Sequence, residues 1–157
     1  MTGSEKGFLT KKNIVIDLDA HSKEDAIRKL SKVLEKNGNV TDSDMFVKDV
    51  LERERLTTTG IGKNIAIPHG KSSAVKDTTL IFAKNKQFLD WNSLDGSKVN
   101  MIFLMAVNTN DAGKEHLKML TKLAGRLMDD NFVAAIKQEN DAEKLLHILK
   151  DEGEETK

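Results

Sequence analysis

Residues 99–107, with the sequence VNMIFLMAV, constrain the fold more than any other part of this chain. Asn100 is the single polar residue of the run, so a strand there is apolar on both faces and both faces of its sheet must be covered. A second β-prone run, DTTLIFAK at residues 77–84, precedes it, and residues 13–18 form a third. The sequence therefore predicts buried strands that need helices on either side.

Apolar residues at helical spacing predict those covering helices. Ser22, with Asp25 three residues later, forms a capping-box pattern before an apolar stripe that ends at Gly38. Thr41 and Asp44 repeat the pattern and predict a second helix directly after the first. Helical spacing then returns after the long apolar strand, in residues 112–127, 132–136 and 142–149.

The region between the early helices and the long strands has short β-prone runs in place of helical spacing. Residues 57–59 and 65–67 are β-prone, glycines interrupt the run between them, and Pro68 stops it. Residues 88–96 are predicted to form a connection that ends in an Asp-Gly turn. Helices, then strands, then helices again are typical of an α/β sandwich.

The chain length predicts one domain with a full hydrophobic core. Residues 1–11 are expected to be a loose segment, residues 12–150 the folded domain, and residues 151–157 a frayed charged tail. The 25 Lys and Arg balance 25 Asp and Glu, and this disfavours binding to nucleic acid or an anionic membrane. The chain has no cysteine and no apolar run of membrane-spanning length, so we expect a cytoplasmic protein that is not inserted in a membrane.

Four histidines are the residues that titrate near neutrality without perturbation. His21 and His147 are predicted to be solvated surface groups. His69 follows Pro68 and precedes Gly70, which suits a nucleophile or general base as well as a plain loop histidine. His116 lies on the apolar stripe of its helix and near the helix start. Two interpretations are therefore open: a residue of the core and a functional residue.

Several motifs fail when their spacing is counted. Gly70-Lys71-Ser72 imitates the end of a phosphate-binding loop, but that motif requires glycine at position 65, where this chain has isoleucine. Gly60-Ile61-Gly62 begins a dinucleotide fingerprint that also lacks its third glycine. No pair of histidines or of glutamate and histidine has metal-ligand spacing, so we expect neither a metal nor a cofactor.

The segment from Glu54 to Gly70 resembles a known signature. It runs from the acidic Glu54 through Ile61-Gly62 to the ending Ile-Ala-Ile-Pro-His-Gly, and it is similar to that of the IIA domain of the fructose/mannitol class of the phosphoenolpyruvate-dependent sugar phosphotransferase system. The resemblance extends through Trp91, Leu94-Asp95-Gly96 and Glu115-His116-Leu117, and covers residues 12–150. It implies a central mixed β-sheet flanked by helices on both faces.

The resemblance implies that His69 accepts a phosphoryl group and passes it on. Arg53 matches the family's active-site arginine, with Arg55 as a nearby rival, and His116 matches a second histidine that orients His69 or stabilises the phosphoryl group. A guanidinium can hold phosphate oxygens with paired N–H donors. An anion cradle is predicted from the residues that lie close to these groups in the sequence: Thr58, Thr59, Gly60, Gly62 and Gly70.

The partners implied by the resemblance are the phosphocarrier protein HPr as donor and the IIB domain of a sugar permease as acceptor. That permease would recruit the protein to the membrane, and fructose is the favoured sugar. An alternative is a regulatory phosphoacceptor of the nitrogen-related branch, which controls target proteins through its phosphorylation state. A binding module with a degenerate site is a third interpretation, disfavoured by intact Arg53, His69 and His116.

Overall fold

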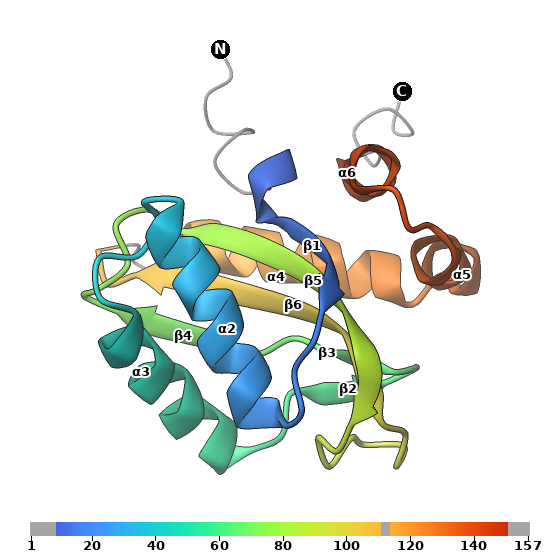
Figure 1. The fold of residues 1–157 in the computed structure, drawn as a ribbon, viewed down its shortest axis with the longest axis horizontal. Helices are drawn as coiled ribbons and strands as arrows, with labels where there is room; N and C mark the ends of the chain where they lie inside the picture. The colour runs from blue at the N-terminus through green and yellow to red at the C-terminus, as the bar shows by residue number, and fades with distance from the viewer. Residues whose placement is uncertain (1–8, 111–113, 151–157) are drawn as a thin grey trace.

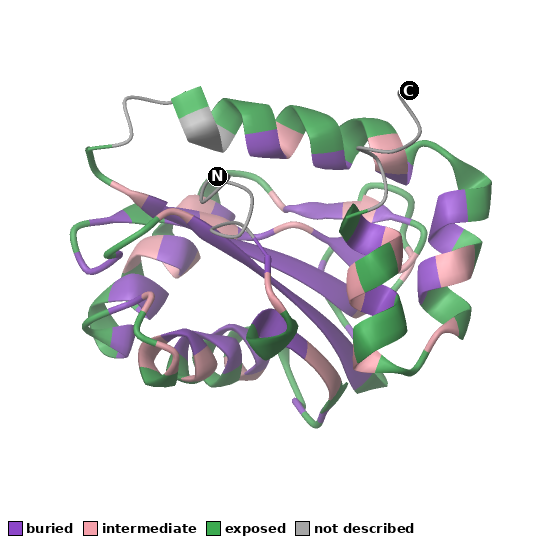
Figure 2. Cartoon of the chain, turned by 90° about the horizontal axis from the view of Figure 1, so that it is seen from above, coloured by how far each residue is buried: buried purple, intermediate pink, exposed green. Residues whose placement is uncertain are grey.

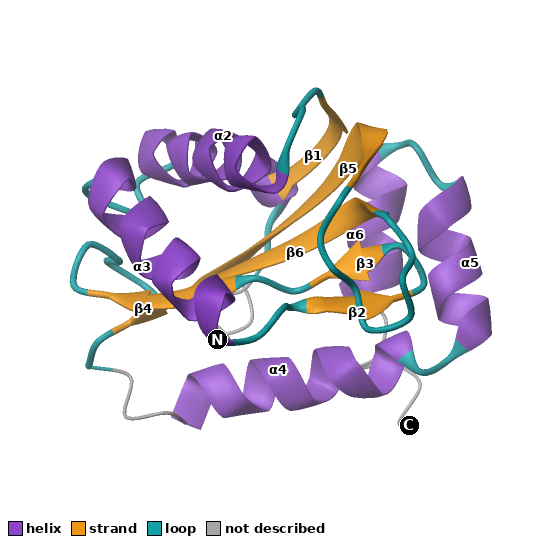
Figure 3. Ribbon diagram, turned by 90° about the horizontal axis from the view of Figure 1, so that it is seen from below, coloured by secondary structure: helices purple, strands orange, loops and turns teal. Residues whose placement is uncertain are grey.

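A computed structural model describes residues 9–110 and 114–150, apart from the side chains of Glu115 and His116. A mixed sheet of six described strands lies between two layers of helices (Figure 1), which confirms the predicted α/β sandwich. Helices α2 and α3 cover one face of the sheet, and α4, α5 and α6 cover the other (Figure 3). The elements in chain order are η1 (Lys11–Asn13), β1 (Ile14–Leu18), α2 (Lys23–Lys36), α3 (Ser43–Leu56), β2 (Gly60–Gly62), β3 (Ile65–Ala66), β4 (His69–Ser72), β5 (Thr79–Leu89), β6 (Val99–Asn108), α4 (Lys114–Leu127), α5 (Asp130–Gln138) and α6 (Ala142–Lys150).

Strand β6 is the centre of the sheet. It pairs antiparallel with β5 along one edge, and along the other it pairs in parallel first with β3 and then with β4. Successive side chains of β6 alternate between the two cores: Ile102, Leu104 and Ala106 on the α2–α3 side, and Met101, Phe103, Met105 and Val107 on the other. Burial along the central strands (Figure 2) confirms the prediction that residues 99–107 are covered on both faces of the sheet.

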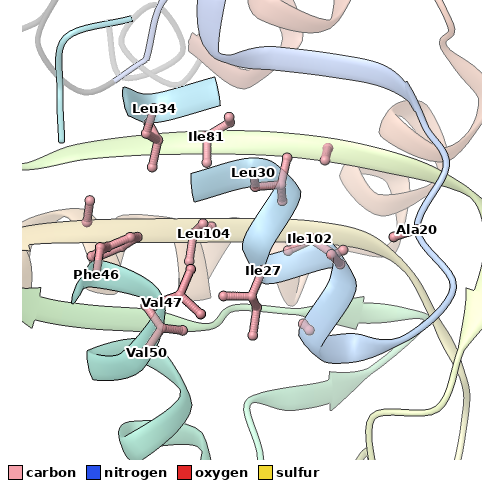
Figure 4. Packing of buried hydrophobic residues seen from close by; sticks show 14 of the residues in the cluster. Ala20, Ile27, Leu30, Leu34, Phe46, Val47, Val50, Ile81, Ile102 and Leu104 are labelled. Carbon is pink, nitrogen blue, oxygen red and sulfur yellow. The ribbon is translucent and has the colours of Figure 1, made fainter. Parts of the chain in front are cut away.

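The core between the sheet and the first two helices is made mostly of aliphatic side chains (Figure 4), together with Phe46 and Trp91. Ile27, Leu30 and Leu34 repeat at helical spacing along α2 and pack on the sheet. Full burial of each such side chain stabilises the fold by about 1.5–3 kcal/mol. The α3 residues of this core are Phe46, Val47 and Val50.

The capping box predicted at the start of α2 is confirmed. The Ser22 hydroxyl oxygen accepts a hydrogen bond from the Asp25 N–H at 3.0 Å, and Asp25 Oδ2 accepts one from the His21 N–H at 3.0 Å. The first bond satisfies an N–H group that the helix cannot pair, and the second satisfies the N–H of the residue before the N-cap. Beyond the end of the helix, Gly38 has a φ of +86°, the left-handed conformation that glycine adopts without strain.

The cap predicted for α3 is wrong by one residue. The N-cap is Asp42, whose carboxylate accepts the Met45 N–H at 3.1 Å, and not Thr41. Thr41 instead donates both its N–H and its hydroxyl to the carbonyl oxygen of Ala74, at 2.7 Å and 3.2 Å. This long-range pairing removes Thr41 from the cap and leaves the role to the next residue able to accept.

Strand β5 is longer than the sequence predicts. It runs to Leu89, which pairs with Val99, so residues 88 and 89 belong to the strand and not to the predicted connection. The register shifts between Lys84 and Leu89, and this irregularity carries the strand past its polar segment.

The predicted domain limits fall largely outside the described residues. Residues 1–8 of the expected loose segment and the whole tail at 151–157 are among those the structure does not describe. Leu9 is buried in the core on the α4 side of the sheet, and η1 begins at Lys11. None of the helices described is long and apolar enough to cross a membrane.

Candidate functional site

His69 lies at the first position of β4, where the chain resumes pairing with the central strand. The Pro68 carbonyl oxygen accepts the Met105 N–H at 3.0 Å, and His69 is in register with Met105. Proline has no N–H to donate, so it suits the break between β3 and β4. The sequence predicts a histidine delivered to a loop, but the structure places His69 in a strand, half-buried.

Gly70 sets the position of α3 against this strand. A Cβ at Gly70 would lie 2.7 Å from Val50 Cγ2 and 3.2 Å from the Val50 backbone nitrogen. Only a residue without a side chain lets the helix approach so closely. Because neighbouring side chains in a strand point to opposite faces, His69 points away from α3, to the same face as its partner in register, Met105. Helix α4 covers that face of the sheet (Figure 3).

The imidazole of His69 is held by the backbone of its own approach segment. Its Nδ1 lies 3.2 Å from the Ile67 carbonyl oxygen. A carbonyl oxygen can only accept, so this contact is a hydrogen bond when Nδ1 carries the proton. In that tautomer the lone pair of the neutral ring is on Nε2.

Arg53 and Arg55 have different surroundings, although both lie in the last turn of α3. Arg53 is three residues beyond Val50, on the same side of the helix, and its Nη1 donates to the Thr57 carbonyl oxygen at 3.1 Å. Arg55 pairs with Glu52 at 2.9 Å, with its side chain 72% exposed. The half-buried Arg53 is therefore the arginine on the side of α3 that faces β4.

The loop between α3 and β2 uses most of the donors that the sequence predicts for an anion cradle. Thr59 donates its N–H and its hydroxyl to the two carboxylate oxygens of Glu54. The Thr58 hydroxyl donates to the Trp91 carbonyl oxygen at 2.6 Å and accepts the Gly60 N–H at 3.1 Å. These contacts shape the loop itself, so the cradle role of Thr58, Thr59 and Gly60 stays a prediction.

Gly62 has a conformational role in the turn between β2 and β3. Its φ is +104°, and a Cβ there would lie 2.8 Å from Asp95 Oδ2. That carboxylate accepts the Lys63 N–H at 3.2 Å and the Ser97 N–H at 2.9 Å, and hydrogen bonds from Ser97 and Lys63 hold the pKa of Asp95 below its usual range. Hydrogen bonds to Asp95 thus fix the turn between β2 and β3 to the loop before β6.

His116 lies in the first turn of α4, but its side chain falls outside the described residues, so its predicted role stays a prediction. His21 and His147 are exposed, as the sequence predicts. In the part of the chain that the structure describes, no group of three or more metal-ligating side chains could hold a metal ion.

Sequence reasoning did not assign Glu54 to the site, although it begins the signature. Its side chain is 4% exposed and lies 3.5 Å from the Lys23 ammonium. Glu54 follows Val50 by four residues, so its position on the buried side of α3 could have been found from the helical spacing. Its pairing with Lys23 joins two helices and has no signal in the sequence.

Comparison with known proteins agrees with this arrangement. The family described as "Phosphoenolpyruvate-dependent sugar phosphotransferase system, EIIA 2" matches residues 7–152. The 2-O-alpha-mannosyl-D-glycerate-specific EIIABC component of Escherichia coli K12 is 36% identical over 133 residues, 84% of this chain, but the chain spans only 20% of that relative. The fructose-like EIIA component of the same organism is 29% identical over 141 residues, 90% of this chain and 94% of the relative.

Solved structures give the same result. The nitrogen regulatory protein IIA-Ntr of Neisseria meningitidis aligns with a TM-score of 0.83 and 30% identity, covering 90% of this chain and 96% of that one. The IIA mannitol domain, solved as a complex with phosphorylated IIB from Escherichia coli, aligns with a TM-score of 0.75 and 26% identity, covering 90% and 96%. The chain belongs to the EIIA 2 family of the phosphoenolpyruvate-dependent sugar phosphotransferase system.

Proposed function

We propose that this protein is a phosphoryl carrier and that His69 Nε2 is the atom that accepts and releases the phosphoryl group. The observation that carries the proposal is the 3.2 Å contact between His69 Nδ1, at the first residue of β4, and the Ile67 carbonyl oxygen, which is a hydrogen bond in the tautomer with the proton on Nδ1. It holds the ring in one orientation and leaves the nucleophilic lone pair on the opposite nitrogen.

The transfer exchanges one phosphorus–nitrogen bond for another. The Nε2 lone pair forms a bond to phosphorus while the bond between phosphorus and the donor's histidine nitrogen breaks, and its electron pair returns to that donor nitrogen. The proton on Nδ1 stays there, held by the Ile67 carbonyl oxygen. In the second transfer, the bond to Nε2 breaks in the same way toward the acceptor.

Arg53 supplies the positive charge in this scheme. Arg53 lies in the last turn of the helix that packs against Gly70, and one nitrogen of its guanidinium donates to the Thr57 carbonyl oxygen. The remaining N–H groups can bind the equatorial phosphoryl oxygens, where negative charge is spread in the transition state. His116, carried by α4 on the face to which His69 points, orients His69 or stabilises the group.

The proposed donor is HPr, and the proposed acceptor is the IIB domain of a sugar permease. A single nitrogen serves both transfers, so the two partners must bind in turn at the same surface. The solved complex of the mannitol IIA domain with phosphorylated IIB supports a IIB domain as one of these partners. The exchange would occur in the cytoplasm, with the permease recruiting the protein to the membrane.

The proposed substrate system is one for fructose or a related sugar. A fructose-like EIIA relative of similar length supports this assignment. A second candidate is nitrogen-related regulation, and the specific observation that favours it is the TM-score of 0.83 to the nitrogen regulatory protein IIA-Ntr. In that case, target proteins would bind according to whether His69 is phosphorylated.

Phosphorylation followed by intact mass tests the carrier role. The protein is incubated with phosphoenolpyruvate, enzyme I and HPr, and we expect one acid-labile phosphoryl adduct on the wild type and on a His21→Ala control, but none on His69→Ala. Stoichiometric labelling of His69→Ala would contradict the assignment. The phosphorylated protein is then mixed with a fructose-type IIB domain: rapid loss of the adduct to IIB supports transport, and retention of it favours the regulatory function.

A further inference from the structure

Glu54 is a buried carboxylate with a complete set of partners. Its side chain is 4% exposed, and Oε2 accepts the Thr59 N–H at 2.9 Å while Oε1 accepts the Thr59 hydroxyl at 2.7 Å. The Lys23 ammonium lies 3.5 Å from Oε2. A buried carboxylate is costly unless such donors surround it, so this arrangement must hold the loop firmly.

The partner of Glu54 leads directly to the ring of His69. The Thr59 carbonyl oxygen accepts the Ile67 N–H at 3.0 Å, and the Ile67 carbonyl oxygen faces His69 Nδ1 at 3.2 Å. A path of three polar contacts, which crosses the backbone of Thr59 and then that of Ile67, thus joins the carboxylate of α3 to the imidazole of β4. Displacement of Thr59 would move the carbonyl that selects the tautomer of His69.

A buried tryptophan fixes the same threonine from the other side. Trp91 Nε1 donates to Thr59 Oγ1 at 3.2 Å, and the ring is 1% exposed. Lys23 Nζ lies 5.7 Å from the centroid of that ring, so the ammonium contacts both the carboxylate and the aromatic face. Thr59 has little freedom to move while Glu54 and Trp91 are in place.

Glu54 also neighbours the arginine of the site. Arg53 Nη1 donates to the Thr57 carbonyl oxygen, and Glu54 binds Thr59, so consecutive residues of α3 hold two points of one loop. The loop in turn holds the approach segment of His69 through Ile67. Glu54 therefore couples the placement of the guanidinium to the placement of the imidazole.

We propose that Glu54 is a positioning residue for phosphoryl transfer, acting through Thr59 and Ile67 to keep the His69 proton on Nδ1 and the lone pair on Nε2. The inference rests on the proposed function for its kinetic consequence, but the effect on the His69 tautomer is independent of any phosphoryl donor. A carboxylate is needed because both of its oxygens accept from Thr59. An amide would offer one oxygen and turn its NH2 toward a donor.

Glu54→Gln tests the proposal, with Glu52→Gln as its control, since Glu52 lies on the same helix with an exposed side chain. Two-dimensional ¹H–¹⁵N spectra of the histidine rings report the tautomer of His69 without a phosphoryl donor. We expect Nδ1–H in the wild type and in Glu52→Gln, and a mixture of tautomers in Glu54→Gln. A His69 spectrum in Glu54→Gln identical to that of the wild type would overturn the proposal.

Kinetics of phosphorylation by phospho-HPr give the second readout. We expect Glu54→Gln to lower kcat about tenfold, because the ring is no longer held in line, with KM little changed since the docking surface is intact. A change in KM alone would refute a positioning role. If the wild type accepts no phosphoryl group, the proposed function fails while the tautomer result still decides the role of Glu54.

Thr59→Val keeps the proposal testable if Glu54→Gln is not folded, as judged by the absence of a cooperative unfolding transition. This change removes the hydroxyl that Glu54 and Trp91 share but keeps the Thr59 N–H and the shape of the side chain. We expect a partial loss of the Nδ1–H tautomer and a smaller fall in kcat than in Glu54→Gln. An unchanged tautomer in a folded Thr59→Val protein would also overturn the proposal.

Discussion

Replacing Gly70 with alanine should separate α3 from the strand that carries His69. The added Cβ would lie 2.7 Å from Val50 Cγ2, and 3.2 Å and 3.3 Å from the Val50 backbone nitrogen and Cα. A rotation of the valine side chain relieves the first contact, but the other two require the helix itself to move. Overpacking of this kind costs about 1–3 kcal/mol.

The expected loss in the free energy of unfolding for Gly70→Ala is therefore about 2 kcal/mol, or about 4–8 °C in Tm for a chain of this length. Urea unfolding with linear extrapolation measures it. The control is Gly125→Ala, because nothing lies within 4 Å of a Cβ at this position of α4. There we expect stabilisation of about 0.5–1 kcal/mol from helix propensity.

A double-mutant cycle with Val50→Ala separates close packing from other effects of the methyl group. In the Val50→Ala background Cγ2 is absent, so Gly70→Ala should cost about 1 kcal/mol less than in the wild type, with the backbone contacts accounting for the remainder. Equal costs in both backgrounds, or a cost below about 0.5 kcal/mol in the wild type, would refute the argument that Gly70 is needed for the approach of α3.

Three further changes test other parts of the account. Asp25→Ala should lower the free energy of unfolding by about 0.5–1 kcal/mol at neutral pH, because the capping box is lost. The hydrogen bond from the His21 N–H lowers the pKa of Asp25 from 3.8, so this difference should be present above pH 3.8 and should vanish as the pH falls through the folded-state pKa. Urea unfolding at a series of pH values measures it. Lys84→Met should cost about 1–3 kcal/mol in the same assay, since the ammonium binds the carbonyl oxygens of Lys137 and Glu139 at the end of α5 and the change leaves them unpaired. Arg53→Gln should slow phosphorylation by phospho-HPr about 10²-fold while Arg55→Gln leaves it unchanged; equal rates for the two variants would remove Arg53 from the site.

The layered fold could be predicted because its signals are local. The run at residues 99–107 is apolar on both faces wherever it is placed, and Ser22 with Asp25 caps a helix through contacts within four residues. The boundary at Thr41 could not be predicted in the same way. A carbonyl of Ala74, thirty-three residues away, takes its N–H and hydroxyl, and only the folded chain brings them together.

The end of β5 has a similar explanation. The polar residues after Lys84 suggest the end of the strand, yet Leu89 still pairs with Val99. Lys84 itself is buried, and its ammonium binds the end of α5. Burial lowers the pKa of this lysine, while the carboxylate of Glu139 opposes the shift. Contacts between elements that are distant in the sequence therefore decide where this strand stops.

The site, too, has parts that the sequence predicts and parts that only long-range contacts determine. The signature around Pro68, His69 and Gly70 marks the position of the imidazole, and the nearby Arg53 follows from the resemblance. The partners of the loop could not be predicted from the sequence, because Trp91 and Lys23 contact Thr59 and Glu54 from other elements. The role of Thr58, Thr59 and Gly60 as anion ligands stays a prediction, and the structure adds that their hydrogen bonds shape the loop.

The most direct test of the central claim is the ¹⁵N and ³¹P NMR spectrum of the protein phosphorylated through HPr, with the histidine rings labelled with ¹⁵N. We predict phosphorus coupling to Nε2 of His69, with the proton on Nδ1 retained. Coupling to Nδ1 of His69, or to a nitrogen of His21, His116 or His147, would contradict it.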